Sequence, residues 1–367
     1  MYNWQQKDWK IFKFQQEKLE DLLLTFTEKL GLAKGLLQSL SEKNHSESLI
    51  DLLVTEAIKN AEIEGEYFSR KDVMSSIKNN LGLNNKLELI KDINANGMAA
   101  LVTEIHKQYE LPLTETMLFS WHKMIFPNTN RITVGAWRSH SETMQVISGT
   151  IGKEKVHFEA PPSTMVPEEM SAFIKWFNET APKGKCEIKY APIRCAIAHL
   201  YFETIHPFED GNGRIGRAIA EKALLQTLNF PLLISLSSAI EADKKAYYQA
   251  LKEGQKSNEI TSWLVYFINT LIQAQNNAEL LINFTLQKAK LFDQYKDVLN
   301  TRQIKVLKRM LKEGPNGFDG GMTAKKYIKI TNTSKATATR DMQHLKELEI
   351  FISFGEGRST AYKINNV

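Results

Sequence analysis

A glycine-rich turn between two helical stretches most constrains the fold of this chain. Residues 206–217 read HPFEDGNGRIGR, and the apolar residues from Ile193 to Tyr201 before them repeat with the spacing of an α-helix. The turn also matches the glycine pattern of dinucleotide-binding folds, which need a β-strand before the first glycine. Because a helix precedes the turn and no strand–helix–strand unit is visible, the sequence argues against that class of fold.

The same turn contains the residue types that bind phosphate. Gly211 and Gly213 permit backbone conformations closed to other residues, and successive N–H groups at a helix N-terminus bind anions. Arg214 and Arg217 lie three residues apart on one face of the following helix. Their guanidinium groups match phosphate oxygens in geometry and charge, so the turn is predicted to bind phosphate.

The turn also supplies a base and a metal ligand. Asp210 is a hard oxygen ligand of the kind that Mg²⁺ takes when it also binds a nucleotide phosphate. His206 is suited to act as a base near neutral pH, and Phe208 is expected to pack in the core. A purely structural glycine turn would not explain these residues together, so the sequence predicts a phosphate-transfer site.

Helical periodicity dominates the rest of the chain up to about residue 295. The predicted helices lie within 15–130, at about 48–68, 99–109 and 114–126, and then at 167–179, 192–205, 214–228, 244–255 and 260–295. Between them, 144–147 and 155–158 are extended runs around a glycine-containing turn, which predicts a β-hairpin. The predicted fold is therefore mainly α, a helical bundle with a small β-hairpin.

The last segment has a different pattern and a different charge. Helical stretches at 301–312, 323–329 and 334–348 precede two short extended runs around a Gly-Glu-Gly turn, which predicts a winged helix-turn-helix. Residues 301–367 contain 13 Lys and Arg against 6 Asp and Glu, a net of +7, so the other 300 residues carry −2 of the total of +5. With 367 residues, two or three domains are expected, and we place them at 1–98, 99–297 and 298–367.

The composition indicates a cytoplasmic protein. The two cysteines, Cys186 and Cys195, cannot build a disulfide framework and lack the spacing of a metal site, which favours a reducing compartment. No apolar run approaches the roughly 18 residues of a membrane span, and the polar N-terminus lacks the apolar region of a signal peptide. We therefore expect no membrane partner.

The motif resembles the signature of the Fic family, in which the fifth position is Asp or Glu, and every specified position is filled. The similarity extends over about residues 100–275, including 135–138 and 160–166, which resemble the hairpin "flap" of the family, and 247–251, which resembles the segment after the core. Residues 4–9 resemble an amino-terminal helical region attached to some members. The resemblance implies a Fic-type helical bundle.

The resemblance also implies a protein adenylyltransferase (AMPylase), which transfers AMP from ATP to a Ser, Thr or Tyr hydroxyl of a target protein. It makes His206 the base that deprotonates the hydroxyl and Asp210 the ligand of a Mg²⁺ that bridges the α- and β-phosphates. Arg214 and Arg217 would hold the β- and γ-phosphates. The exposed edge of the hairpin could bind an extended target peptide through backbone hydrogen bonds and present its hydroxyl to His206.

Five further positions are assigned to the nucleotide by the resemblance. Gly211, Asn212 and Gly213 would cradle the phosphates, with the Asn212 side chain contributing, and Tyr248 and Gln255 would line the adenine pocket. A tyrosine on a helix more often packs in the core than binds a ligand, so packing stays open as the alternative for Tyr248.

Residues 60–65, NAEIEG, resemble the inhibitory helix of many Fic proteins. In that motif a glutamate pairs with the second motif arginine, which here predicts an ion pair between Glu64 and Arg217. Asn60 departs from the Ser or Thr that is usual four residues before the glutamate, but it can still donate and accept hydrogen bonds. The alternative is that Glu64 is a solvated charge at a helix end.

Several alternatives remain open at this point. In the predicted winged helix, Lys335, Thr337 and Arg340 are available to DNA, but such modules also bind proteins or form homodimers. The chain could therefore be a DNA-binding regulator whose Fic core senses a nucleotide. It could also be a de-AMPylase, because the inhibitory glutamate positions water in some relatives. Relatives that transfer phosphoryl groups depart from the Gly213-Arg214 pair, which is intact here.

Overall fold

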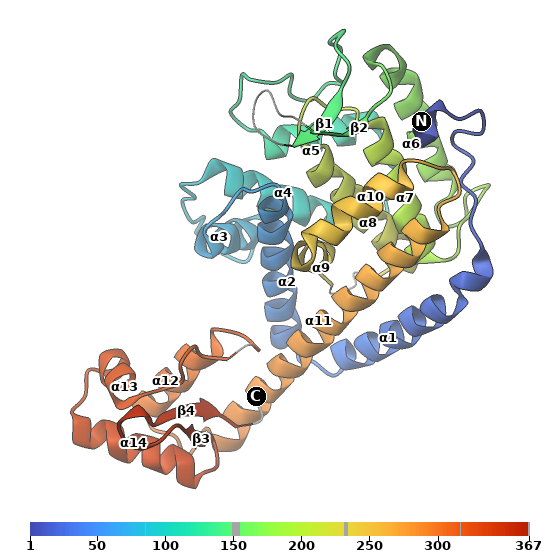
Figure 1. Ribbon diagram of the computed structural model, residues 1–367. Helices are drawn as coiled ribbons and strands as arrows, with labels where there is room; N and C mark the ends of the chain where they lie inside the picture. The colour runs from blue at the N-terminus through green and yellow to red at the C-terminus, as the bar shows by residue number, and fades with distance from the viewer. Residues whose placement is uncertain (85, 149–154, 231–233, 316, 366–367) are drawn as a thin grey trace. The chain divides into compact units, whose positions relative to one another are not determined.

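The chain folds into two compact units. The structure is a computed structural model that describes residues 1–84, 86–148, 155–230, 234–315 and 317–365 (Figure 1). The first unit comprises Met1–Lys34 and Leu49–Asn277, and the second comprises Gly35–Ser48 and Ala278–Val367. Most described residues are helical and the strands are few and short, so the predicted mainly α fold is confirmed. None of the described helices is both long and apolar enough to cross a membrane.

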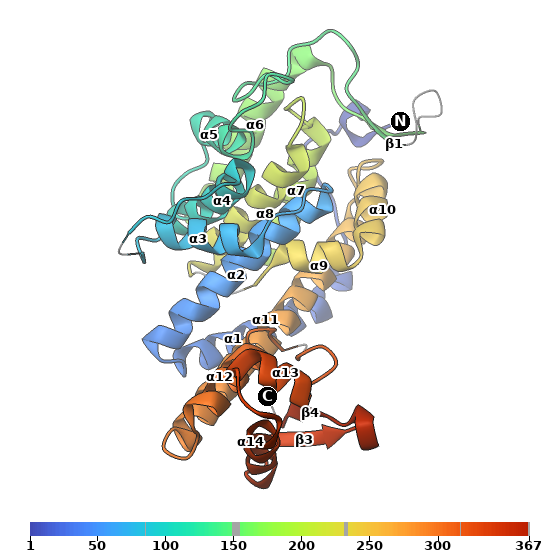
Figure 2. The ribbon, with the colours of Figure 1, turned by 90° about the vertical axis from the view of Figure 1, so that its left-hand side faces the viewer.

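Two consecutive helices, α7 (Ala191–Ile205) and α8 (Asn212–Leu228), form the centre of the first unit (Figure 2). Every residue of α7 is buried, as expected for a helix that is apolar on all sides. Most of α8 is buried as well. The short turn between them contains the glycine-rich motif, so the motif is held by the most buried part of the unit.

The other helices of this part of the chain pack on that pair or on one another. They are α1 (Glu20–Gln38), α2 (Glu42–Ile63), α3 (Arg70–Asn80), α4 (Ile93–Gln108), α5 (Glu115–Ile125), α6 (Val166–Glu179), α9 (Leu236–Ala242), α10 (Lys244–Gly254) and α11 (Thr261–Tyr295). Among them, α3 packs on α4. The sequence did not predict α3 or α9 as separate helices. α3 is short and buries two serines beside Val73 and Ile77, which weakens its apolar period, and α9 has only seven residues.

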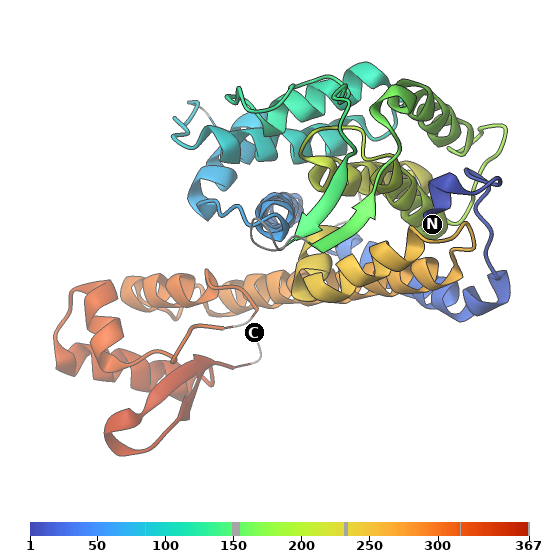
Figure 3. The ribbon, with the colours of Figure 1, turned by 45° about the horizontal axis from the view of Figure 1, so that its top comes forward.

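The predicted hairpin is present and is contacted by the N-terminal segment (Figure 3). β1 (Gln145–Ser148) pairs with β2 (Lys155–Glu159) in antiparallel fashion, with Val146 opposite Phe158. The predicted turn between them, 149–154, lies outside the described residues. Trp4 Nε1 donates a 2.8 Å hydrogen bond to the carbonyl oxygen of Glu159, and the ring of Tyr2 packs edge-on against Phe158. The N-terminus therefore supports one strand of the hairpin.

The second unit has the predicted order of elements. Three helices, α12 (Thr301–Leu311), α13 (Ala324–Thr331) and α14 (Lys335–Glu347), are followed by the antiparallel strands β3 (Phe351–Phe354) and β4 (Ala361–Ile364). Buried side chains of these elements and of the last part of α11 share one apolar core, which includes Leu307, Leu345 and Phe351. The assignment of this unit as a winged helix stays a prediction. The domain boundaries that we placed from the sequence stay predictions as well.

Candidate active site

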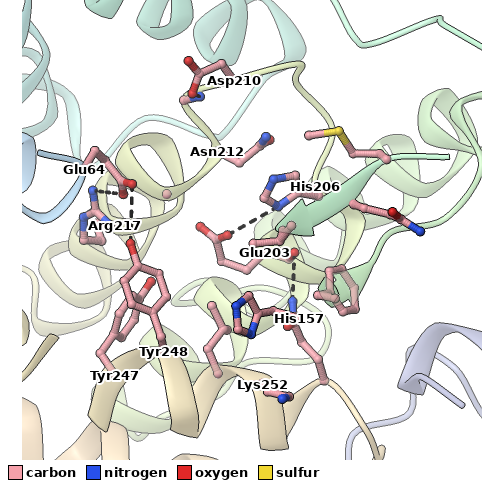
Figure 4. Close-up of a pocket in the computed structure, with 18 of the residues that line it drawn as sticks. Glu64, His157, Glu203, His206, Asp210, Asn212, Arg217, Tyr247, Tyr248 and Lys252 are labelled. Atoms are coloured by element: carbon pink, nitrogen blue, oxygen red, sulfur yellow. Dashed lines mark hydrogen bonds and ion pairs between the residues drawn. The ribbon is translucent and has the colours of Figure 1, made fainter. Parts of the chain in front are cut away.

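A cavity of about 630 Å³ lies where the hairpin, the α7–α8 turn, α10 and the end of α2 meet (Figure 4). All the site residues predicted from the sequence line it except Arg214. They are Glu64, His206, Asp210, Gly211, Asn212, Gly213, Arg217, Tyr248 and Gln255. The residues come from three parts of the chain that are far apart in sequence, so the fold brings the predicted site together.

The turn that carries the motif is fixed by its own residues. His206 ends α7 in the left-handed conformation, with φ 51° and ψ 58°, and Gly211 begins α8 with φ 81°. A Cβ at Gly211 would lie 2.7 Å from the ring of Phe126, so only glycine fits there without a shift. Phe208 is fully buried and stacks on His122 at 4.1 Å, in agreement with its predicted packing role.

The side chain of Asn212 also has a structural task, and its phosphate-binding role stays a prediction. Its Oδ1 accepts a 2.9 Å hydrogen bond from the N–H of Phe208, and its Nδ2 donates a 2.8 Å bond to the Phe208 carbonyl. These two bonds close the turn across four residues. The side chain therefore holds the loop in shape, and the second N–H of Nδ2 and the backbone N–H of Asn212 are left for a phosphate.

Arg138 holds the end of α7 and was assigned no role from the sequence. Its Nε donates a 2.8 Å hydrogen bond to the carbonyl of His206, and its Nη2 donates to the carbonyl of Ile205 at 3.3 Å. A helix C-terminus leaves such carbonyls without intrahelical partners and favours a positive charge. Burial lowers the pKa of Arg138 to about 10, which still leaves it charged at neutral pH. The sequence pointed to Arg138 only through its position in the segment 135–138, which resembles the flap region of the Fic family.

His206 is a neutral base in this environment. Burial, helped by the charge of Arg138, lowers the pKa of His206 to about 4. Glu203, one helical turn earlier on α7, has its Oε2 3.7 Å from His206 Nδ1, and burial raises the pKa of Glu203 to about 8. Sequence reasoning missed Glu203, although its three-residue spacing from His206 places both on one helix face.

Arg217 forms the predicted ion pair with Glu64, at 2.9 Å between Nη2 and Oε1. Burial alone would raise the pKa of Glu64, but the charge of Arg217 outweighs it, and the pKa lies below its usual value. Asn60 also binds the guanidinium group, since its Oδ1 accepts from Nε at 3.0 Å and from Nη2 at 2.8 Å. A Cβ at Gly213 would overlap Glu64 Oε1, so the glycine turn allows this carboxylate to approach.

Arg214 does not line the cavity, but its Nη2 lies 3.9 Å from Oδ1 of Asp210, which does, and it has a second acidic partner. Its Nη1 lies 3.0 Å from Glu66 Oε1, and its guanidinium group lies over the ring of Phe126 at 4.5 Å. Glu66 follows Glu64 by two residues, and the sequence analysis did not identify it. Both motif arginines are therefore bound by carboxylates of the segment that ends α2.

The two residues expected near the adenine base occupy different surroundings. Tyr248 is partly exposed and its hydroxyl lies 3.5 Å from Glu64 Oε2, so it is available to the cavity. Gln255 is buried, and its Nε2 donates a 3.1 Å hydrogen bond to the carbonyl of Glu203 in the last turn of α7. The nucleotide-binding roles of both residues stay predictions.

Asp210 is the predicted metal ligand of the site. Among the described residues there is no group of three or more His, Cys, Asp or Glu side chains that could hold a metal ion. Asp210 lines the cavity with an exposed side chain, and Figure 4 shows it at the edge away from His206. A Mg²⁺ ion commonly binds one or two carboxylates together with water and substrate phosphates, so a lone Asp210 fits that donor set.

Comparisons with known proteins agree with the motif. Residues 112–224 match the model of the Fic/DOC family, and residues 2–83 match a domain of unknown function (DUF4172). The chain is 31% identical over 111 residues to a Fido domain-containing protein of Dictyostelium discoideum. The match covers 29% of this chain and 72% of that protein.

Two further relatives carry a named activity. A probable protein adenylyltransferase of Aquifex aeolicus is 29% identical over 99 residues, which are 27% of each chain. A protein adenylyltransferase of Caenorhabditis briggsae is 25% identical over 134 residues, which are 36% of this chain and 22% of that relative. The chain thus spans about a quarter of the length of these two relatives.

Solved structures show the same fold at low sequence identity. A Fic family protein from Desulfovibrio desulfuricans matches with a TM-score of 0.55 and 16% identity, covering 95% of this chain and 96% of that one. A Fic domain containing signaling protein from Bacteroides thetaiotaomicron matches with a TM-score of 0.52 and 18% identity, covering 74% of this chain and 97% of that one.

Proposed function

Because this chain belongs to the Fic/DOC family, we propose that it is a protein adenylyltransferase that transfers AMP from ATP to a hydroxyl group of a target protein. Two relatives that bear this name support the activity. The observation that carries the proposal is the shared cavity, in which His206, Asp210, Arg217 and the glycine turn meet. A base, a metal ligand and phosphate-binding groups around one space are what a nucleotidyl transfer needs.

In this proposal, the phosphates of ATP bind at the start of α8. The N–H groups of Asn212, Gly213 and Arg214 lie in its first turn, where a helix offers no acceptor of its own. Arg217 supplies positive charge, and its Nη1 has no hydrogen-bond partner among the described residues. Asp210 would hold Mg²⁺, which supplies charge neutralisation on the phosphates when bound. The adenine base is placed toward Tyr248 and Gln255.

His206 drives the transfer as a general base. The oxygen of the target hydroxyl attacks the α-phosphorus of ATP and forms a new P–O bond, while the bond from that phosphorus to pyrophosphate breaks. The hydroxyl proton passes to Nε2 of His206. With a pKa of about 4, the imidazole is neutral at pH 7 and free to accept this proton. The products are a protein with AMP on its hydroxyl and free pyrophosphate.

The hairpin is placed to present the target. Met144, Gln145, Val146, His157 and Phe158 line the same cavity as His206. An extended peptide that adds to a strand edge would be held by backbone hydrogen bonds, with little dependence on its side chains. Trp4 already occupies the carbonyl of Glu159 on β2. The target would therefore be recognised by its extended conformation next to the hairpin.

The contact of Glu64 and Asn60 with Arg217, hereafter the inhibitory contact, supports autoinhibition. A phosphate oxygen that needs the Arg217 guanidinium must displace a carboxylate 2.9 Å away and the two hydrogen bonds of Asn60 Oδ1. Charge-assisted hydrogen bonds of this kind contribute about 1.5–3 kcal/mol each. Nucleotide would therefore bind without productive placement of its terminal phosphate until the contact is broken.

Mass spectrometry of the intact protein after incubation with Mg·ATP tests this function. The Glu64→Gly variant should gain the mass of AMP on itself or on an added target, the wild type should gain much less, and Glu64→Gly/His206→Ala should gain none. A Glu64→Gly protein that binds ATP but transfers nothing would contradict the proposal. Loss of AMP from an already modified protein, seen only while Glu64 is present, would instead identify a de-AMPylase.

A second candidate function, DNA binding, is favoured by one observation in the second unit. The exposed side chains in the first half of α14 include Lys335, Thr339 and Arg340 and no acid, and neither Lys335 nor Arg340 forms an ion pair with a described residue. Unpaired cations at the start of such a helix suit DNA phosphates. A salt-dependent mobility shift of the full-length protein that Lys335→Ala/Arg340→Ala removes would support it, and a shift unaffected by that variant would contradict it.

A further inference from the structure

Glu203 is a buried carboxyl group in the cavity to which the proposed reaction assigns no task. It lies on α7 and is 3% exposed, and its Oε2 faces His206 Nδ1 at 3.7 Å (Figure 4). Within the described part of the chain, Glu203 Oε1 and His206 Nδ1 have no hydrogen-bond partner. Buried polar atoms are almost always paired, so two neighbouring unpaired ones call for an explanation.

A purely structural role does not explain this carboxyl group. The nearest cation, Arg217 on α8, lowers the pKa of Glu203, but its guanidinium group is bound by Glu64 and Asn60 instead. Glu64 on α2 is a second acid that acts on Glu203 and raises its pKa. An unpaired buried carboxyl group costs free energy that an apolar side chain of the same size would not.

The fold makes room for this group at some expense in packing. A Cβ at position 216 of α8 would overlap Glu203 Oε1, so Gly216 opens the space that the carboxyl group fills between the two central helices. On α10, the hydroxyl of Tyr247 faces the same region, and burial, together with the charge of Glu203, raises the pKa of that hydroxyl. The carboxyl group is therefore buried against α8, and it lines the cavity together with His206.

The orientation of His206 decides what Glu203 can do. Arg138 holds the backbone of His206 by donating a hydrogen bond to the His206 carbonyl. The left-handed backbone conformation of His206 sets the direction in which its side chain leaves the backbone. A neutral imidazole has one N–H and one bare nitrogen, and the proton sits on the nitrogen that finds an acceptor. Among the described residues, the Glu203 carboxyl oxygen Oε2 lies 3.7 Å from Nδ1, and the backbone carbonyl of Glu203 also acts on the ring, where it partly offsets the lowering of the pKa by burial.

We propose that Glu203 is a positioning residue that keeps the imidazole proton of His206 on Nδ1, so that Nε2 presents its lone pair to the target hydroxyl. The inference rests on the transferase reaction proposed above. As the hydroxyl oxygen bonds to the α-phosphorus and pyrophosphate leaves, Nε2 gains the hydroxyl proton and the ring becomes positively charged. The Glu203 carboxyl group stabilises that charge until the proton passes to water. The 3.7 Å separation closes to a hydrogen bond when substrate binds, as free enzymes often show looser catalytic contacts.

Two substitutions in the Glu64→Gly background separate this role from packing. Glu203→Gln keeps an acceptor for the Nδ1 proton but no charge, and Glu203→Leu keeps the volume without an acceptor. We expect kcat to fall about tenfold in Glu203→Gln and about 100-fold in Glu203→Leu, with KM for ATP unchanged. Glu221→Gln is the control, because Glu221 is a buried carboxyl group on α8 that pairs with His106 outside the cavity, and its kcat should not change. Equal activity of the Gln and Leu variants would overturn the proposal.

The pH profile gives a second readout. The ionised carboxylate stabilises the positive ring better than the neutral acid, so kcat should rise as the pH approaches the pKa of Glu203, about 8 with Glu64 in place. Arg217 lowers this pKa and Glu64 raises it, so the rise should lie at or below that value in the Glu64→Gly background. In Glu203→Gln this rise should be absent. An unchanged profile in Glu203→Gln would contradict the role.

Side-chain ¹⁵N NMR of histidine separates failure of this inference from failure of the proposed function. His206, identified by the signal missing in His206→Ala, should carry its proton on Nδ1 in the wild type and in Glu203→Gln, and should shift toward the Nε2–H tautomer in Glu203→Leu. This measurement needs no activity, so it decides the matter even if Glu64→Gly transfers no AMP. An Nε2–H tautomer in the wild type would overturn the inference and leave the transferase proposal standing on its own test.

Discussion

The two ends of the cavity treat their charged groups in opposite ways. At the arginine end, Arg217 is already bound by Glu64 and Asn60, which supply a carboxylate and an amide oxygen. At the histidine end, His206 Nδ1 and Glu203 Oε1 have no hydrogen-bond partner among the described residues. At the arginine end the protein's own acid occupies the place of a ligand, although Arg217 Nη1 is still without a partner among the described residues. At the histidine end the base and the neighbouring acid face each other at 3.7 Å without a hydrogen bond.

This difference suggests that control and chemistry are separated within one pocket. Leaving a buried guanidinium group unpaired is strongly unfavourable, so the arginine end needs either the inhibitory contact or a phosphate. The histidine end is stabilised instead by Arg138, which binds the backbone of His206 and leaves its ring free. Changes at the arginine end should therefore alter the degree of autoinhibition, and changes at the histidine end should alter the rate of the chemical step.

The largest expected effect comes from the histidine end. His206→Ala in the Glu64→Gly background should lower the rate of AMP transfer about 1000-fold, since a general base typically contributes 10²–10⁴-fold. Binding of ATP, measured by calorimetry, should be nearly unchanged because Arg217 and the glycine turn remain. Comparable transfer rates with and without His206 would show that the base lies elsewhere and that the comparison drawn above is wrong.

At the arginine end, Asn60→Ala should raise AMP transfer above the wild type by about fivefold to tenfold, less than Glu64→Gly. It removes the two hydrogen bonds to Arg217 that Asn60 Oδ1 accepts, each worth about 1.5–3 kcal/mol because the donor is charged. The carboxylate and the hydrogen bond from Nη2 to the Asn60 backbone carbonyl stay in place, so the net effect is smaller than that sum. Asn44→Ala, on the same helix and remote from the cavity, is the matched control. If Asn60→Ala stays as inactive as the wild type, the asparagine adds nothing to the inhibitory contact.

The sequence revealed the part of this site that is contiguous. His206, Asp210 and the glycines could be found because a turn between two helices places them within a few residues of one another. Glu64 is distant in sequence, and it was found through a resemblance to an inhibitory motif. The two hydrogen bonds between the Asn212 side chain and Phe208 were not predicted, because they depend on the three-dimensional path of the turn.

The residues that were missed act through long-range contacts or through burial. Arg138 reaches the end of α7 across 68 residues of sequence, and no local pattern shows such a contact. Glu66 binds Arg214 across 148 residues. Glu203 is the exception, because its spacing from His206 is local, but an acid on a helix is usually solvated, and only the structure shows it to be buried. The fold class was easier, since periodicity alone identified most of the helices.

A smaller effect is expected from the second acid at the arginine end. Glu66→Gln should raise AMP transfer by about twofold, because the Glu66 side chain is 38% exposed and exposed ion pairs contribute only about 0.2–1 kcal/mol. A double variant with Asn60→Ala tests whether the two contacts act independently, in which case their effects multiply. An effect of Glu66→Gln as large as that of Glu64→Gly would mean that Arg214, and not Arg217, controls the pocket.

The smallest effect is the pH dependence of the inhibitory contact. Arg217 lowers the pKa of Glu64 in the folded protein, so the contact contributes its full stability above the ordinary pKa of a glutamate and loses it only as the pH falls through the lower folded value. The difference in melting temperature between the wild type and Glu64→Gln should therefore be constant from pH 8 to pH 6 and should shrink toward zero only in acid. A difference that already changes between pH 8 and pH 6 would mean that a group of higher pKa, such as Glu203, titrates with the inhibitory contact, and that the two ends of the cavity are not separate.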